Sequence, residues 1–317
     1  MNRKSYLILI GAAVVLLNTS CEKYLDYDGE DAKPRLVLNG IFTPDSVFSV
    51  ELSNSAGYSD KGSLTTISNG KVAVFDSNGN FLDSLKHTNN GVYKGVYTAS
   101  ANKSYTVQAS AGSVGSVWAS DYVPESVPIV NWDTMTTIIT EFDYADKRIQ
   151  IDYTINDPAG SENFYVIEVY ITEYYYLNYQ YDPITGTQWM DTVYHDQPYR
   201  SLYGFSTTDA ILLSEVDAEI GETMYYTNSL AYSDALFDGK TQTFRIVVGY
   251  YGGQPGANID LELKSCSEAY YKYKRTLDNY YYTGGDPFSQ PVQVFNNIKN
   301  GGLGIWAGYS TAVVSIE

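Results

Sequence analysis

The sequence is poor in the residues that build metal centres. Its 317 residues include two histidines, His87 and His195, and two cysteines, Cys21 and Cys266. A structural zinc site takes four Cys or His ligands and some catalytic zinc sites take three histidines, so we expect neither. The motifs Gly-x-Ser-x-Gly, His-Glu-x-x-His and Gly-x-x-x-x-Gly-Lys are absent as well. We therefore expect no enzyme, cofactor or metal, although 37 acidic residues leave the paired carboxylates of a glycosidase open.

Positive charge is also scarce. Lysine and arginine number 20 against 37 aspartates and glutamates, which gives a formal net charge of −17 at pH 7. A surface of this sign repels phosphate backbones, so we expect no nucleic-acid partner. Any attachment to a membrane must come from a lipid rather than from a basic face.

The sequence lacks an apolar run long enough to cross a bilayer. Its first apolar segment, Tyr6–Leu17, is about a dozen residues, against the ~20 that a spanning helix needs. Arg3 and Lys4 precede this segment, and Thr19 and Ser20 lead from it to Cys21. This is the layout of a secretory signal peptide, predicted over residues 1–20.

A bacterial lipoprotein requires a cysteine at the cleavage point, so we interpret Cys21 as the acylated first residue of the mature chain. It should then label with palmitate. Asn18 departs from the usual leucine three places before the cysteine, and the alternative is an incidental cysteine. The acidic residues 21–33 suit a tether between the lipid and the fold. An acylated Cys21 leaves Cys266 without a partner, so no intramolecular disulfide is expected.

Composition and periodicity favour an all-β, mainly antiparallel fold. The chain holds 32 tyrosines and 26 glycines. Residues 34–125 contain short alternating segments, such as VFSVELS at 47–53, with turns at Asn78-Gly79 and Asn90-Gly91. They predict an Ig-like or prealbumin-like sandwich of about seven strands. Pro124 and Pro128 mark a boundary, and residues 126–317 are predicted to form a larger β-rich domain.

One short helix is expected in this C-terminal domain. Ser265 and Glu268 have the spacing of a capping box, and tyrosines then recur at helical intervals over residues 267–281. Cys266 lies at the start of this helix. A buried, inert thiol is the preferred interpretation, because a reactive one needs electropositive neighbours that a sequence does not locate.

Aromatic residues are concentrated in a predicted hairpin from Glu173 to His195, which turns at residues 182–186. Three successive tyrosines must place rings on both faces of a strand. Exposed Tyr and Trp stack on sugars or peptides and anchor interfaces. The alternative is that the rings fill a wide core or cover the domain junction. The candidate partner or ligand surface consists of Tyr174, Tyr175, Tyr176, Tyr179, Tyr181, Trp189 and Tyr194.

Two C-terminal segments carry a family resemblance. Residues 265–281, SCSEAYYKYKRTLDNYY, and 286–310, DPFSQPVQVFNNIKNGGLGIWAGYS, resemble the ending of a family of Bacteroidota outer-membrane lipoproteins catalogued as domain of unknown function 4249. The early segment PRLVLNGIFTPDS at 34–46 is similar to the family as well, and KVAVFDSNGN at 71–80 resembles prealbumin-like or carboxypeptidase-regulatory-like modules. The specific part of the match runs through Asn297, Ile298, Gly301, Gly302, Gly304, Ile305 and Gly308.

The resemblance implies a location and a partner rather than a reaction. Members of this family are typically encoded near TonB-dependent receptors, so it implies a lipid-anchored outer-membrane protein that assists such a receptor in capturing or importing a glycan, peptide or other small ligand. It supplies no catalytic residues. A structural or adhesive cell-surface lipoprotein without a small ligand remains the alternative. A hydrolase is a third one. The face of the outer membrane that it occupies stays open.

Overall fold

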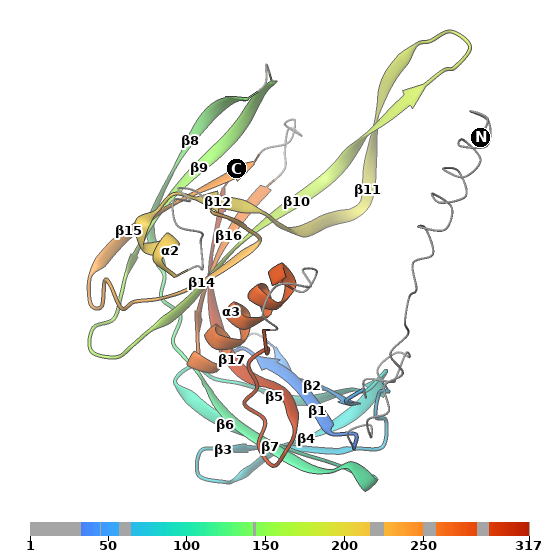
Figure 1. Cartoon of the computed structure of the whole chain (residues 1–317), viewed down its shortest axis with the longest axis vertical. Helices are drawn as coiled ribbons and strands as arrows, with labels where there is room; N and C mark the ends of the chain where they lie inside the picture. Colours follow the sequence, from blue (N-terminus) through green and yellow to red (C-terminus); the bar gives the residue numbers. More distant parts are fainter. Residues whose placement is uncertain are drawn as a thin grey trace, which may run out of the picture. The chain divides into compact units, whose positions relative to one another are not determined.

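The computed structural model describes residues 33–44, 46–56, 65–141, 144–215, 225–249, 258–283 and 292–316. The predicted signal peptide, Cys21 and all of the predicted tether except Lys33 lie outside the described residues. Contacts unite Pro34–Ser55 and Leu64–Glu317 into one compact unit (Figure 1). None of the helices in the described ranges is long and apolar enough to cross a membrane.

The N-terminal part is built from antiparallel hairpins, as the sequence predicts. Asn90, Gly79 and Gly91 adopt the positive φ angles that the two predicted Asn-Gly turns require. Inward residues alternate with outward ones along Lys71–Asp76 and Lys103–Ala111, which gives the period of two seen in the sequence. The strands are β1 (Leu36–Phe42), β2 (Val47–Asn54), β3 (Lys71–Asp76), β4 (Phe81–Asn89), β5 (Val92–Thr98), β6 (Lys103–Ala111) and β7 (Gly115–Val123), with a 3₁₀ turn η1 (Gly112–Val114) between the last two.

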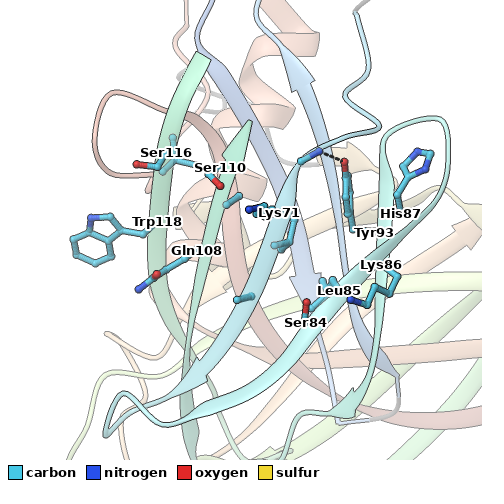
Figure 2. A pocket seen from close by; sticks show the side chains of 15 residues that line it. Lys71, Ser84, Leu85, Lys86, His87, Tyr93, Gln108, Ser110, Ser116 and Trp118 are labelled. Carbon is cyan, nitrogen blue, oxygen red and sulfur yellow. Dashed lines mark hydrogen bonds between the residues drawn. The ribbon is translucent and has the colours of Figure 1, made fainter. Parts of the chain in front are cut away.

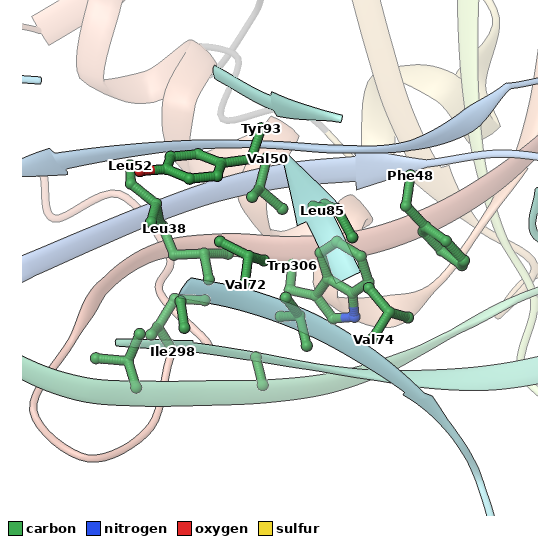
Figure 3. Packing of buried hydrophobic residues seen from close by; sticks show 14 of the residues in the cluster. Leu38, Phe48, Val50, Leu52, Val72, Val74, Leu85, Tyr93, Ile298 and Trp306 are labelled. Atoms are coloured by element: carbon green, nitrogen blue, oxygen red, sulfur yellow. The ribbon is translucent and has the colours of Figure 1, made fainter. Parts of the chain in front are cut away.

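The last strand of the chain completes this N-terminal core. Strand β17 (Leu303–Ile316) pairs in parallel with β1, from Val37 opposite Leu303 to Phe42 opposite Gly308. Trp306 is fully buried among residues of β1, β2 and β6. It belongs to the hydrophobic cluster that Figure 3 shows. A Cβ atom at Gly40 would lie 2.7 Å from the Trp306 ring, so β1 needs a glycine there. The boundary near residue 125 stays a prediction, with β17 contributing to the cores on both sides of it.

The remaining described strands confirm the all-β class. In the described ranges one sheet of 12 strands has the order β11-β10-β16-β17-β1-β2-β5-β4-β3-β6-β7, with β14 also paired to β10, and a five-stranded sheet has the order β13-β12-β15-β9-β8. Both are antiparallel apart from the β1–β17 pair. The further elements are β8 (Ile129–Glu141), β9 (Tyr144–Asn156), β10 (Phe164–Tyr181), β11 (Gln188–Tyr203), β12 (Phe205–Thr207), α2 (Ala210–Ser214), β13 (Tyr225–Thr227), β14 (Ser229–Ser233), β15 (Thr241–Gly249), β16 (Asn258–Cys266) and α3 (Glu268–Thr283).

The predicted helix is present as α3, but its cap is Ser267 rather than the predicted Ser265. Ser265 lies in β16, where its hydroxyl accepts a hydrogen bond from the backbone of Val127 at 2.9 Å. Ser267 is the cap instead, since its hydroxyl oxygen accepts from the backbone N–H of Tyr270 at 3.2 Å. The short helix α2 was not predicted. At five residues it is too short for a helical period to show in the sequence.

Candidate partner surface on the β10–β11 hairpin

The predicted aromatic hairpin is confirmed and continues beyond the neighbouring strands. Strands β10 and β11 pair from Val169 opposite Tyr203 to Tyr181 opposite Gln188. The turn is closed by Asp182, whose carboxylate accepts from the backbone of Ile184 and from the hydroxyl of Thr185. The last residue of β10 that pairs with β16 is Thr172, so the outer part of the hairpin is a two-stranded ribbon (Figure 1).

The aromatic rings of this ribbon are exposed. Tyr179 is 78 % exposed and Tyr194 is 73 % exposed. Tyr174, Tyr176, Tyr181 and Trp189 are exposed as well, and Tyr175 is half-buried. No residue of β11 is buried. The alternative in which these rings fill a core is therefore wrong.

Cross-strand register sorts the candidate residues onto two faces. Directly opposed residues share a face, and Tyr175 lies opposite Tyr194 with ring centroids 5.6 Å apart. Tyr179 lies opposite Met190, and two residues further out Tyr181 lies opposite Gln188. We call this side the tyrosine face, and it consists of Tyr175, Tyr179, Tyr181, Met190 and Tyr194.

The opposite face of the ribbon is more polar. Trp189 lies opposite Gln180, and its indole N–H donates to Asp191 at 3.3 Å. Tyr176 lies on this face as well, with its ring 5.3 Å from that of His195. A register shift between Glu173 and Tyr175 separates Tyr174 from both sets. The hydroxyl of Tyr174 instead accepts from Asn258 of β16. The seven predicted residues therefore do not form one surface.

Charged side chains fix the base of the hairpin on the sheet. Arg200 of β11 reaches Glu262 at 2.7 Å and Asp260 at 3.3 Å, both on β16, and covers the ring of Tyr170 at 3.8 Å. The base of the ribbon that carries the tyrosine face is thus fixed by ion pairs with two acidic residues and by a cation–π contact.

Glu168 of β10 forms a second, buried network beside this base. Its carboxylate accepts from Lys264 of β16, from Lys274 of α3 at 3.2 Å and from Ser229 of β14 at 3.0 Å. Burial alone would raise the pKa of Glu168, but the charges of the two lysines outweigh it and lower the pKa to about 2. The network ties the helix to the strands that support the hairpin.

The other candidate chemical groups have structural roles. Asp157, Asp234 and Asp238 are the one group of metal-ligand type in the described ranges. Asp157 already accepts hydrogen bonds from Tyr165 and from the backbone of Gly239, so its oxygens hold a turn.

Cys266 is 1 % exposed, and burial raises the pKa of its thiol well above the usual value, which makes it inert. The buried thiol expected from the sequence is confirmed.

Comparisons with known proteins give one family match. The family model described as "Domain of unknown function (DUF4249)" matches residues 22–314. No curated protein sequence matches. Among solved structures, the "Biofilm associated protein - BSP domain" and the "Biofilm associated protein - B domain" are both 11 % identical with a TM-score of 0.14. The alignments cover 93 % and 92 % of this chain, and 61 % and 88 % of those chains respectively. The chain spans 61 % of the length of the first.

Proposed function

The chain belongs to the family described as domain of unknown function (DUF4249), and from this premise we propose that it is a non-catalytic, lipid-anchored outer-membrane binding protein. Its lipid is carried by Cys21, and its tyrosine face docks a TonB-dependent receptor that takes up a nutrient. The observation that carries this proposal is an exposed, uncharged aromatic face on a chain whose net charge is −17.

The ribbon that carries the tyrosine face extends well beyond the strand that supports its base. Residues 173–181 of β10 extend past the last pair with β16, and at ~3.3 Å per residue they span about 30 Å. A two-stranded ribbon is only marginally stable in water by itself. Tyrosine presents an apolar ring with a polar tip, a combination that is enriched at protein interfaces. A partner that covers this face would bury the rings and stabilise the ribbon.

The partner class comes from the family resemblance rather than from the hairpin itself. An outer-membrane lipoprotein shares its membrane with TonB-dependent receptors, and a ribbon of this length would reach a neighbouring protein. Because the tyrosine face is uncharged, binding through it should depend weakly on salt.

One observation favours the alternative, an adhesive or structural surface protein. Strand β11 is the edge of the large sheet, so one side of its backbone carries no strand partner among the described residues. An exposed edge strand is a template for pairing with another chain, including a second copy. In that case the hairpin would assemble copies of this protein rather than dock a receptor.

A pull-down of the tagged protein from detergent-solubilised outer membranes tests the proposal. The double variant Tyr179→Ala/Tyr194→Ala should lose the co-purifying receptor, because truncating interface hot spots costs ~2 kcal/mol or more, about 30-fold in affinity. The wild-type complex should survive a tenfold increase in salt. Tyr281→Ala, which removes a ring that is 74 % exposed on α3, is the matched control and should retain the receptor.

The melting temperature of each variant separates binding from folding. The Tyr179→Ala/Tyr194→Ala variant should melt within about 2 °C of wild type, because surface substitutions shift stability by ~0.5 kcal/mol each. A lower melting temperature with the receptor still bound would assign these rings to the fold alone. Recovery of a second copy in place of a receptor would favour the adhesive alternative.

A further inference from the structure

A pocket of about 770 Å³ lies on the N-terminal sandwich (Figure 2), and no residue of the tyrosine face lines it. It forms where β4 stops pairing with β3 and begins to pair with β5. Strand β4 pairs with β3 as far as Leu85 opposite Val72, and its next residues pair with β5 instead. Strands β3 and β4 therefore stop pairing at Lys71 and Lys86, and residues of both strands at this point line the pocket.

The side chains at the mouth of the pocket come from adjacent strands in register. Trp118 of β7 lies directly opposite Gln108 of β6, and Lys71 of β3 lies opposite Ser110 of β6. Trp118 is 46 % exposed, and Figure 2 shows it projecting from the sheet together with Gln108. An indole, an amide, a hydroxyl and an ammonium group thus line the same pocket.

The charge of this pocket is opposite to that of the molecule. Its described lining residues include Lys71, Lys86 and His87 and no aspartate or glutamate, although the chain has 37 acidic residues. Within the described ranges, neither lysine has a carboxylate within salt-bridge distance. Lys86 also lies directly opposite Lys94 of β5, a like-charge pair that destabilises a sheet. An anionic ligand would relieve this repulsion.

We propose that this pocket binds an acidic glycan, a sugar chain that carries carboxylate or sulfate groups. The flat indole of Trp118 provides a stacking surface for a sugar ring, and Gln108 and Ser110 supply hydrogen bonds to its hydroxyls. Lys71 and Lys86 pair with the anionic groups. This site uses neither the tyrosine face nor a receptor, so it stands independently of the proposed docking function.

Calorimetry on the protein lacking residues 1–21 tests the site with three hexasaccharide probes, namely oligogalacturonate, heparosan and chondroitin sulfate. At least one should bind, with an affinity that falls as salt rises. If oligogalacturonate is that probe, its fully methyl-esterified form keeps the rings and loses the charges, and should bind at least 10-fold more weakly. A single-stranded DNA decamer should bind more weakly than that probe. Tighter binding of the decamer than of every glycan would overturn the proposal.

Two pairs of variants locate the binding. Trp118→Ala and Lys71→Gln/Lys86→Gln should each weaken the acidic glycan at least 10-fold, and the lysine variant should also flatten the salt dependence. The matched controls are Trp132→Ala, an exposed tryptophan on β8, and Lys103→Gln/Lys240→Gln, which removes the same charge elsewhere. Both controls should bind as wild type does.

The two surfaces are distinguished by testing the variants of each surface in the binding assay of the other. Trp118→Ala should still co-purify with the receptor, and Tyr179→Ala/Tyr194→Ala should still bind the glycan. The glycan site is disproved if none of the three probes binds to the folded protein lacking residues 1–21. It is also disproved if both pocket variants keep the full affinity for the glycan. Either result holds whatever the outcome for the receptor.

Discussion

Replacing Trp306 should destabilise the N-terminal sandwich, although this residue is 11 positions from the C-terminus. Its side chain is fully buried, with ring centroids 4.3 Å from Phe42 and 5.7 Å from Phe48. The indole N–H donates to the backbone oxygen of Tyr105 at 2.9 Å. The variant Trp306→Ala removes these contacts together and leaves a cavity where β1, β2 and β6 meet.

The magnitude follows from burial. Truncating a buried tryptophan to alanine costs ~3–5 kcal/mol. At about 2 °C per kcal/mol for a chain of this size, the melting temperature should fall by about 6–10 °C. Trp306→Phe keeps most of the ring contact and loses the N–H bond, so it should cost ~1–3 kcal/mol and fall between the alanine variant and wild type.

Thermal unfolding followed by circular dichroism, on the protein lacking residues 1–21, measures this effect. The matched control is Trp132→Ala, which removes an exposed tryptophan and should shift the midpoint by no more than about 1 °C. If Trp306→Ala melts as the control does, β17 is not part of the sandwich core and the described pairing of β1 with β17 is wrong.

Two further predictions concern the buried charge network and the anchor. Glu168→Gln removes the buried carboxylate that Lys264 and Lys274 share, which leaves Lys264 only the more distant Glu262 at 3.9 Å. It should cost ~3–5 kcal/mol in chemical denaturation, whereas the exposed Glu162→Gln should cost nothing measurable. Because the folded pKa of Glu168 lies below the reference value of 4.5, its stabilising effect should be complete above about pH 4.5 and be lost as the pH falls toward 2, so wild type and Glu168→Gln should converge in stability in acid. Cys21→Ala should abolish palmitate labelling and release the protein from membranes, and persistent labelling would contradict the lipid assignment.

Local patterns predicted the strands and turns, but not where the strands meet. The Asn-Gly turns and the alternation in β2 were visible because both are written within a few neighbouring residues. The parallel pairing of β17 with β1 was not predicted, because Leu303 and Val37 are far apart in sequence and parallel strands carry no turn signal between them. The spacing between Ser265 and Glu268 predicts a helix cap at Ser265, although the strand continues through Cys266.

The candidate sites show the same limit. Period-two alternation assigns residues to a face of a strand, but it does not say whether another element covers that face. The exposure of Tyr179 and Tyr194 therefore became visible only in the structure. No local pattern in the sequence connects Lys71, Lys86 and Trp118, since they lie on three different strands. The alternation within each strand predicts that each of these side chains points outward. Only the register between the strands places them at one pocket.

Photo-crosslinking from position 179 in the intact outer membrane tests the docking proposal most directly. With p-benzoylphenylalanine in place of Tyr179, the tyrosine face should crosslink to a TonB-dependent receptor, and the same replacement at Tyr281 should give no such product. A crosslink to a second copy of this chain, or equal receptor crosslinking from both positions, would contradict the proposal that the tyrosine face docks a receptor.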